Sequence, residues 1–172
     1  MIGQKNLKDK IDKIIDRFPT FFIVQGTKGS GKKTLCSYIA YKLGLTTLQV
    51  GTKIEDIRNL IDLAYNHSKP TLFIISNAEN MSVAAKNSLL KITEEPPKNS
   101  YFVLTVCNLD LMLDTLKSRA SIFSLEDYSK QELIEYRKFM NYSSGYDDII
   151  LDVCVTTGDV NELFGYNIPE FY

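Results

Sequence analysis

Tryptophan is absent from this 172-residue sequence, histidine occurs once, and only three cysteines are present. Cys36, Cys107 and Cys154 are widely spaced and form no Cys-x-x-Cys pair, so neither a disulfide framework nor a cysteine zinc site is indicated. A single histidine likewise excludes a histidine-rich metal site. Reduced thiols are the expected state, which favours a cytoplasmic protein without zinc.

Long hydrophobic runs and an excess of either charge are also missing. No apolar run approaches the roughly 20 residues that a membrane-spanning helix needs, and the polar start MIGQKNLKDK contains no apolar signal core. We therefore expect no membrane partner. Lys and Arg number 20 and Asp and Glu 21, so no strong overall field draws the chain toward nucleic acid. This total says nothing about a local basic patch.

The sequence does have enough apolar side chains for a core, since 44% of its residues are hydrophobic. Short apolar runs predict five strands, at residues 21–25, 47–50, 71–76, 101–107 and 121–125. Apolar residues at helical spacing predict helices at residues 4–17, 32–43, 54–64, 82–93 and 111–118. This alternation with short connections predicts an α/β fold with a parallel sheet flanked by helices.

The pattern changes near Asp127. Beyond this residue only helical patterns occur, at residues 129–140, about 146–156 and 159–165. We therefore predict an α/β domain over residues 1–126 and a small all-helical lid over residues 127–172, with a hinge at residues 125–129.

A glycine-rich segment, GTKGSGKKT, lies between the first predicted strand and the helix that follows it. Its residues are Gly26, Thr27, Lys28, Gly29, Ser30, Gly31, Lys32, Lys33 and Thr34. They satisfy the phosphate-loop pattern G-x-x-x-x-G-K in the strand–loop–helix context that the pattern requires. Backbone N–H groups of such a loop turn toward phosphate oxygens, and Lys32 would reach the β and γ phosphates. The segment predicts a site for ATP or ADP; the alternative is a loop that keeps its shape without a ligand.

Three positions depart from what ATP hydrolysis requires. Lys33 stands where a Ser or Thr hydroxyl normally ligates Mg²⁺, and Thr34 comes one residue late, about 100° away around the helix. Ser76 and Asn77 stand at the end of a buried strand where two carboxylates are expected. Glu79 is nearby but out of register. Together these departures speak against a bound Mg²⁺ ion and predict weak or absent hydrolysis.

The stretch AENMSVAAKNSLLKITEEPPKNSYFVLTV (78–106) resembles the clamp-loader branch of the AAA+ ATPases, with most similarity to the DNA polymerase III delta-prime type of its gamma/delta-prime branch. That family carries an A-D-x-M signature followed by N-A-L-L-K-x-L-E-E-P-P. The opening Ile2-Gly3-Gln4 resembles its G-Q box, and Leu116-Lys117-Ser118-Arg119-Ala120 resembles its S-R-C motif. The resemblance covers residues 2 to about 165 and implies a P-loop AAA+ domain followed by a helical lid.

The resemblance implies a role for several single residues. Arg119 takes the position of the arginine finger that reaches a neighbouring subunit's γ-phosphate, and a structural salt bridge is the alternative. Cys107 or Asn108 takes the sensor-1 position. Asn161, within Gly158-Asp159-Val160-Asn161, replaces the lid arginine that contacts nucleotide in the family.

The resemblance also implies partners and two absences. The expected partners are other clamp-loader subunits in a hetero-oligomer, a sliding clamp and primer-template DNA. The candidates for DNA contact are Lys53, Arg58, Lys86, Lys91 and Lys98, with a solvated helix face as the alternative. The zinc-binding insertion common in such subunits is missing before residues 45–50, and the expected C-terminal collar domain is absent from these 172 residues.

Three functions are compatible with these features. The preferred one is a delta-prime-type subunit that hydrolyses little ATP and offers Arg119 to a neighbour. The second is an ATP-hydrolysing motor subunit in which Glu79 and Thr34 take unusual roles. The third is a scaffold that occupies a place in a replication complex without binding nucleotide.

Overall fold

A five-stranded sheet in the order β2-β3-β4-β1-β5 forms the centre of the computed structural model, which describes residues 3–143 and 147–165. All four strand pairings are parallel. The strands are β1 (Phe21–Gln25), β2 (Thr46–Val50), β3 (Thr71–Ser76), β4 (Ser100–Val106) and β5 (Ser121–Ser124). The α-helices are α1 (Lys5–Ile14), α2 (Lys32–Leu43), α3 (Ile54–Asn66), α4 (Val83–Glu94), α5 (Asp114–Lys117), α6 (Lys130–Phe139), α7 (Asp147–Val153) and α8 (Thr157–Gly165). Three short 3-10 helices are η1 (Ile15–Arg17), η2 (Ala78–Asn80) and η3 (Leu109–Leu111).

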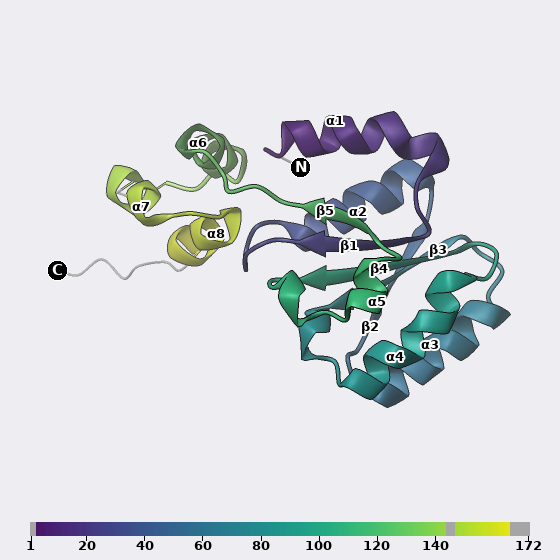
Figure 1. Cartoon of the computed structure of the whole chain (residues 1–172). Helices are drawn as coiled ribbons and strands as arrows, with labels where there is room; N and C mark the ends of the chain where they lie inside the picture. The colour runs from purple at the N-terminus through teal and green to yellow at the C-terminus, as the bar shows by residue number, and fades with distance from the viewer. Residues whose placement is uncertain (1–2, 144–146, 166–172) are drawn as a thin grey trace.

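Helices cover both faces of the sheet, as the α/β prediction requires (Figure 1). Alternate residues of a strand point to opposite faces, so Phe21 and Ile23 pack with α3 and α4, whereas Phe22 and Val24 pack with α1 and α2. All four side chains are buried because β1 lies in the interior of the sheet. Its carboxyl end therefore holds the following loop on a rigid base.

Helices α6, α7 and α8 form a third cluster beside the carboxyl end of the sheet (Figure 1). Leu133, Leu151 and Val160, one from each helix, are buried together. Ser129 begins α6 with a capping box, since its hydroxyl accepts from the Glu132 amide and the Glu132 carboxylate accepts from the Ser129 amide. These helices correspond to the predicted lid.

The segment expected as a hinge is tied to the start of the chain. Gln4 is buried, and its side-chain amide donates to the Glu126 carbonyl at 2.6 Å and accepts from the Glu126 amide at 3.0 Å. Gly3 packs so closely on Tyr128 that a Cβ would lie 2.7 Å from the ring. The described part of the G-Q motif thus holds the connection between the sheet and α6; Ile2 lies outside the described residues.

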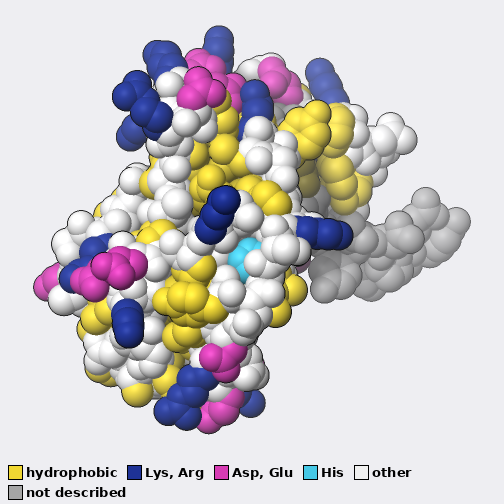
Figure 2. Space-filling view, turned by 90° about the vertical axis from the view of Figure 1, so that its right-hand side faces the viewer, with side chains coloured by type: hydrophobic (Ala, Val, Ile, Leu, Met, Phe, Trp, Pro, Cys, Tyr) yellow, Lys and Arg dark blue, Asp and Glu magenta, His cyan; other side chains and the backbone are white. Residues whose placement is uncertain are grey.

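The amino ends of the strands form the opposite end of the molecule, part of which Figure 2 shows. The only histidine, His67, lies there with its ring nitrogens 3.0 Å from the Ala64 carbonyl and 3.2 Å from the Asn99 carbonyl. It also packs edge-on against Phe73. These contacts give His67 a structural place between α3 and the start of β4. Within the described ranges, no helix is long and apolar enough to cross a membrane.

Candidate functional site

A cavity of about 600 Å³ opens at the carboxyl ends of β1, β3 and β4, between the glycine-rich loop and the helices α6 and α8. The described residues that line it are Lys28, Gly29, Gly31, Lys32, Lys33, Thr34, Ser76, Asn77, Thr105, Cys107, Tyr128, Tyr136, Phe139, Met140, Thr157, Gly158 and Asn161. Ligands of open parallel sheets bind at this edge, because loops and helix N-termini converge there. The cavity contains most of the predicted phosphate-loop residues.

The loop has the backbone shape of a phosphate cradle. Gly31 caps α2 with a φ of 95°, a left-handed conformation that favours glycine. Lys32 begins α2, and its ammonium donates to the carbonyls of Gly26 and Thr27 at 2.6 and 2.8 Å. It also lies 3.4 Å from the Cys107 sulfur. Ser30 is buried in the loop, and its hydroxyl has no hydrogen-bond partner among the described residues.

Helix α8 rests directly on this loop. The Gly158 amide and the Thr157 hydroxyl both donate to the Gly29 carbonyl, each at 3.1 Å. A Cβ on Gly158 would lie 2.4 Å from the Gly29 Cα, so the two backbones touch without room for a side chain. The Tyr128 hydroxyl adds a bond to the Ser30 carbonyl at 3.0 Å. Through these contacts the position of the lid depends on the conformation of the loop.

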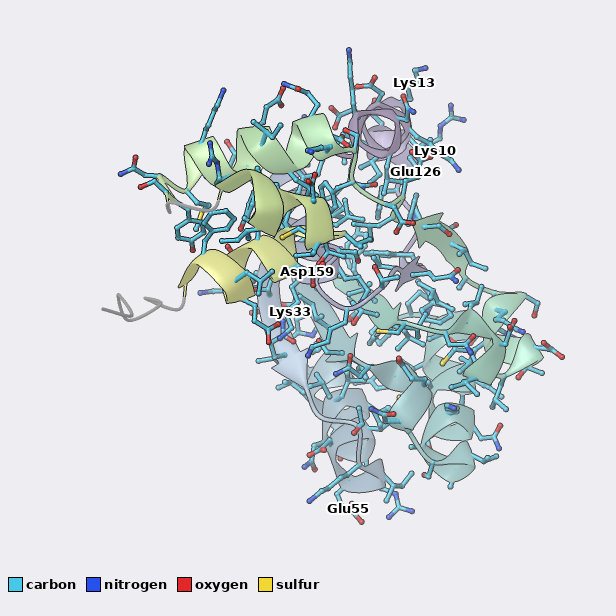
Figure 3. All side chains as sticks on the ribbon, turned by 90° about the vertical axis from the view of Figure 1, so that its left-hand side faces the viewer. Lys10, Lys13, Lys33, Glu55, Glu126 and Asp159 are labelled. Atoms are coloured by element: carbon cyan, nitrogen blue, oxygen red, sulfur yellow. The ribbon has the colours of Figure 1, made fainter. Side chains whose placement is uncertain are left out.

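Asp159 stabilises the end of α8 that faces the loop (Figure 3). Its carboxylate accepts from the amides of Val155 and Thr156 at 3.0 and 2.7 Å, and the Thr156 hydroxyl accepts from the Asp159 amide. Burial acts to raise the pKa of this carboxyl, but the backbone hydrogen bonds outweigh burial and, with help from Lys28, lower the pKa below its usual value of 3.8. Burial likewise raises the pKa of the Tyr128 hydroxyl, which lines the cavity.

The three departures from a hydrolytic site lie together in the cavity, since Lys33, Ser76 and Asn77 all line it. Ser76 donates to the Gln49 side chain at 3.4 Å, and Asn77 turns the chain with a φ of 54°. Glu79 is not among the described lining residues. One of its carboxylate oxygens accepts from the Cys107 amide at 2.9 Å, and the other is buried without a partner among the described residues.

The two candidates for the sensor-1 position make different contacts. Cys107 is exposed, lines the cavity and contacts Lys32. Asn108 instead caps η3, because its side chain accepts from the Asp110 amide at 2.9 Å. Asn161 also lines the cavity and accepts from the Tyr136 hydroxyl at 3.0 Å. Sequence patterns missed the cavity wall formed by Tyr136, Phe139 and Met140, because helical spacing does not reveal which loop a helix faces.

Arg119 lies outside the cavity as far as the described residues define it. It follows α5, where its guanidinium forms an ion pair with Glu94 and donates to the Thr115 carbonyl at 2.7 Å. The Arg119 side chain remains 34% exposed and that of Glu94 48% exposed. The exposed position of Arg119 is compatible with an arginine finger, and its ion pair with Glu94 is compatible with the structural alternative.

The candidates for DNA contact need one correction. Lys86 is only 6% exposed, and its ammonium donates to the carbonyls of Leu111 and Glu79 at 2.7 and 3.2 Å. It joins α4 to η2 and η3 and cannot reach a DNA phosphate. Its helix position alone suggested a surface residue, because no sequence pattern reveals carbonyls arriving from two other segments. The other four candidates, Lys53, Arg58, Lys91 and Lys98, are exposed.

Comparison with known proteins finds similarity to subunits of DNA polymerase III. A family model described as DNA polymerase III, delta subunit, matches residues 45–129. DNA polymerase III subunit gamma of Buchnera aphidicola subsp. Acyrthosiphon pisum is 26% identical over 180 residues, which cover 86% of this chain and 50% of the relative. Subunit delta' of Buchnera aphidicola subsp. Baizongia pistaciae is 33% identical over 94 residues, covering 53% of this chain and 28% of the relative. The chain thus spans half of the first relative's length and less of the second's.

Among solved structures, the RuvB Holliday junction branch migration motor of Thermotoga maritima superposes with a TM-score of 0.76. The match covers 95% of this chain and 61% of that one at 20% sequence identity. Identity this low supports the fold alone. The parallel sheet flanked by helices and the helices that follow it therefore share the fold of the RuvB motor, which agrees with the α/β fold class that the sequence predicted.

Proposed function

We propose that this chain is a delta-prime-type subunit among the AAA+ clamp-loader subunits of the DNA polymerase III gamma and delta-prime branch, as its similarity to the family model and to these relatives supports. In this role it adopts the AAA+ shape, hydrolyses little ATP and supplies Arg119 to the nucleotide site of a neighbouring subunit. Its partners are other clamp-loader subunits, a sliding clamp and primer-template DNA in the cytoplasm.

The observation that carries this proposal is the composition of the cavity. Lys33, Ser76 and Asn77 all line it, and the described lining residues include no Asp or Glu. Hydrolysis in P-loop proteins needs a residue that orients the attacking water and groups that hold the charge of the transferred phosphoryl group. A serine and an asparagine cannot act as the carboxylates of that arrangement. The loop therefore supports binding of ATP or ADP better than turnover.

The position of Arg119 supports a role in a neighbouring site. It lies outside the chain's own cavity among the described residues, on the surface beyond α5. A guanidinium offers permanent charge and forked donors, which suit a γ-phosphate. To contact the γ-phosphate in a neighbouring subunit, the Arg119 guanidinium must first leave its ion pair with Glu94. Because the pair is exposed, the ion pair contributes only about 0–1 kcal/mol, so this exchange costs little.

The ATP-hydrolysing alternative depends on Glu79. Its carboxylate would have to leave the Cys107 amide and enter the cavity, where Lys33 already stands. The scaffold alternative is supported by the contacts of Lys32, whose ammonium donates to the carbonyls of Gly26 and Thr27 within the loop.

Turnover by the isolated chain separates these functions. We expect no Mg²⁺-dependent release of phosphate above that of a Lys32→Ala variant, because no described acid lines the cavity. Turnover that Lys32→Ala abolishes would contradict the proposal, and its further loss in Glu79→Gln would favour the motor function. Equilibrium dialysis with ATP and ADP then tests the scaffold, which predicts no binding at millimolar nucleotide.

A further inference from the structure

We infer that the cavity binds a nucleoside polyphosphate as the metal-free anion, with Lys33 taking the charge-neutralising place of Mg²⁺. This inference rests on the nucleotide-binding part of the proposed function. It does not depend on clamp loading or on Arg119.

The residues present do not fit a Mg²⁺ ion. This ion is usually held by one or two carboxylates together with substrate phosphates, and in P-loop proteins by a hydroxyl after the loop lysine. Here Lys33 takes the hydroxyl's position, and Ser76 and Asn77 take those of the acids. Thr34 lines the cavity too, but it offers one neutral hydroxyl without a carboxylate beside it.

Two acidic residues near the cavity, Glu79 and Asp159, do not supply the missing Mg²⁺ ligands. One Glu79 carboxylate oxygen accepts from the Cys107 amide, and the other is buried without a partner among the described residues. Asp159 is engaged by the amides of Val155 and Thr156. Neither residue is among the described residues that line the cavity.

The same cavity is rich in positive charge. Lys28, Lys32 and Lys33 all line it, and the N-terminus of α2 adds roughly half an elementary charge. Lys32 is occupied by the loop carbonyls and Lys28 interacts with Asp159. The Lys33 ammonium makes no ion pair or hydrogen bond with a described residue, so it is available to a ligand. Figure 3 labels Lys33, at the start of α2, and Asp159 of α8.

Charge matching then favours the free polyphosphate. Metal-free ATP is more negative than its Mg²⁺ complex, so a cavity lined by three lysines, a helix N-terminus and no described acid attracts it more strongly. A divalent cation on the phosphates would meet Lys33 at close range and without carboxylates to offset the repulsion. The site should therefore prefer metal-free ATP to the Mg²⁺ complex of ATP, the reverse of a conventional P-loop site.

The test measures the dissociation constants of ATP and ADP calorimetrically, in EDTA and in excess Mg²⁺ at equal ionic strength, with the whole chain. Wild-type affinity should be at least as high in EDTA as in Mg²⁺. Lys33→Thr should weaken ATP binding in EDTA about tenfold, the usual effect of losing one hydrogen bond to a charged group. Lys10→Thr is the matched control, because it removes the same charge from an exposed position on α1 and should leave affinity unchanged.

A second variant reverses the expected metal dependence. Lys33→Thr combined with Ser76→Asp restores a hydroxyl and a carboxylate, so Mg²⁺ should now strengthen binding. Wild-type binding that Mg²⁺ strengthens would overturn the inference, and so would equal loss of affinity in Lys33→Thr and Lys10→Thr. Absence of binding in both buffers would also overturn it, yet would leave the clamp-loader role intact, because assembly with partner subunits is measured separately.

Discussion

Replacing Gly158 with alanine should separate α8 from the phosphate loop. The added Cβ would lie 2.4 Å from the Gly29 Cα, whereas ordinary contacts begin at 3.4 Å, so the backbones must part by about 1 Å. Both hydrogen bonds to the Gly29 carbonyl start at 3.1 Å and would be lost. At about 1 kcal/mol each, this costs about 2 kcal/mol of local stability.

Hydrogen exchange measures this loss directly. A change of about 2 kcal/mol corresponds to roughly 30-fold faster exchange of the α8 amides if they exchange by local opening. Gly44→Ala is the control. It strains a residue with a φ of 65° but meets no atom within 4 Å, so it should lower overall stability without exposing α8 selectively. Unchanged protection of α8 in Gly158→Ala would refute the proposed coupling between lid and loop.

Three further predictions concern the cavity, the lid and α4. Cys107 is exposed in the cavity, so it should react first with a thiol reagent at pH 8, and bound ATP should protect it. Burial raises the pKa of the Cys36 thiol to about 12, so Cys36 should react only on unfolding. Equal reaction rates of the two thiols would contradict this prediction. Because the folded-state pKa of Asp159 lies below 3.8, its stabilising effect is complete above that pH and is lost as pH falls through the lowered value. The protection of the α8 amides, taken relative to their intrinsic exchange rates at each pH, should therefore fall in acid, and Asp159→Asn should show no such fall. Lys86→Ala should lower the free energy of unfolding, measured in urea, by about 2–3 kcal/mol, because it removes the buried ammonium that donates two hydrogen bonds. Lys91→Ala is the control: Lys91 is exposed, so this change should alter the free energy of unfolding by less than about 0.5 kcal/mol.

The sheet was predictable because buried strands leave a strong local pattern. The run FFIVQ is apolar throughout, since β1 is covered on both faces, and its predicted bounds agree with the structure. The helix expected at residues 111–118 is shorter, at Asp114–Lys117, because Asn108 first caps the 3-10 turn η3. This polar cap, directly before the turn, outweighed the apolar spacing.

The contacts of single site residues were less predictable. Glu94 lies 25 residues before Arg119, and the bond between the Thr157 hydroxyl and Gly29 spans 128 residues. Such pairs are set by tertiary packing and leave no periodic signal in the chain. The phosphate-loop residues were found because their motif and its strand–helix context are both local.

The most direct test of the central claim is ATP hydrolysis by a partner. A gamma-type subunit with intact acidic residues should hydrolyse ATP faster when assembled with this chain, and Arg119→Ala should reduce that rate by about 10³-fold, a typical contribution of an arginine finger. Glu94→Gln, which frees Arg119 from its ion pair, should not reduce the rate. Equal rates with wild type and Arg119→Ala, in complexes shown to be assembled, would contradict the account.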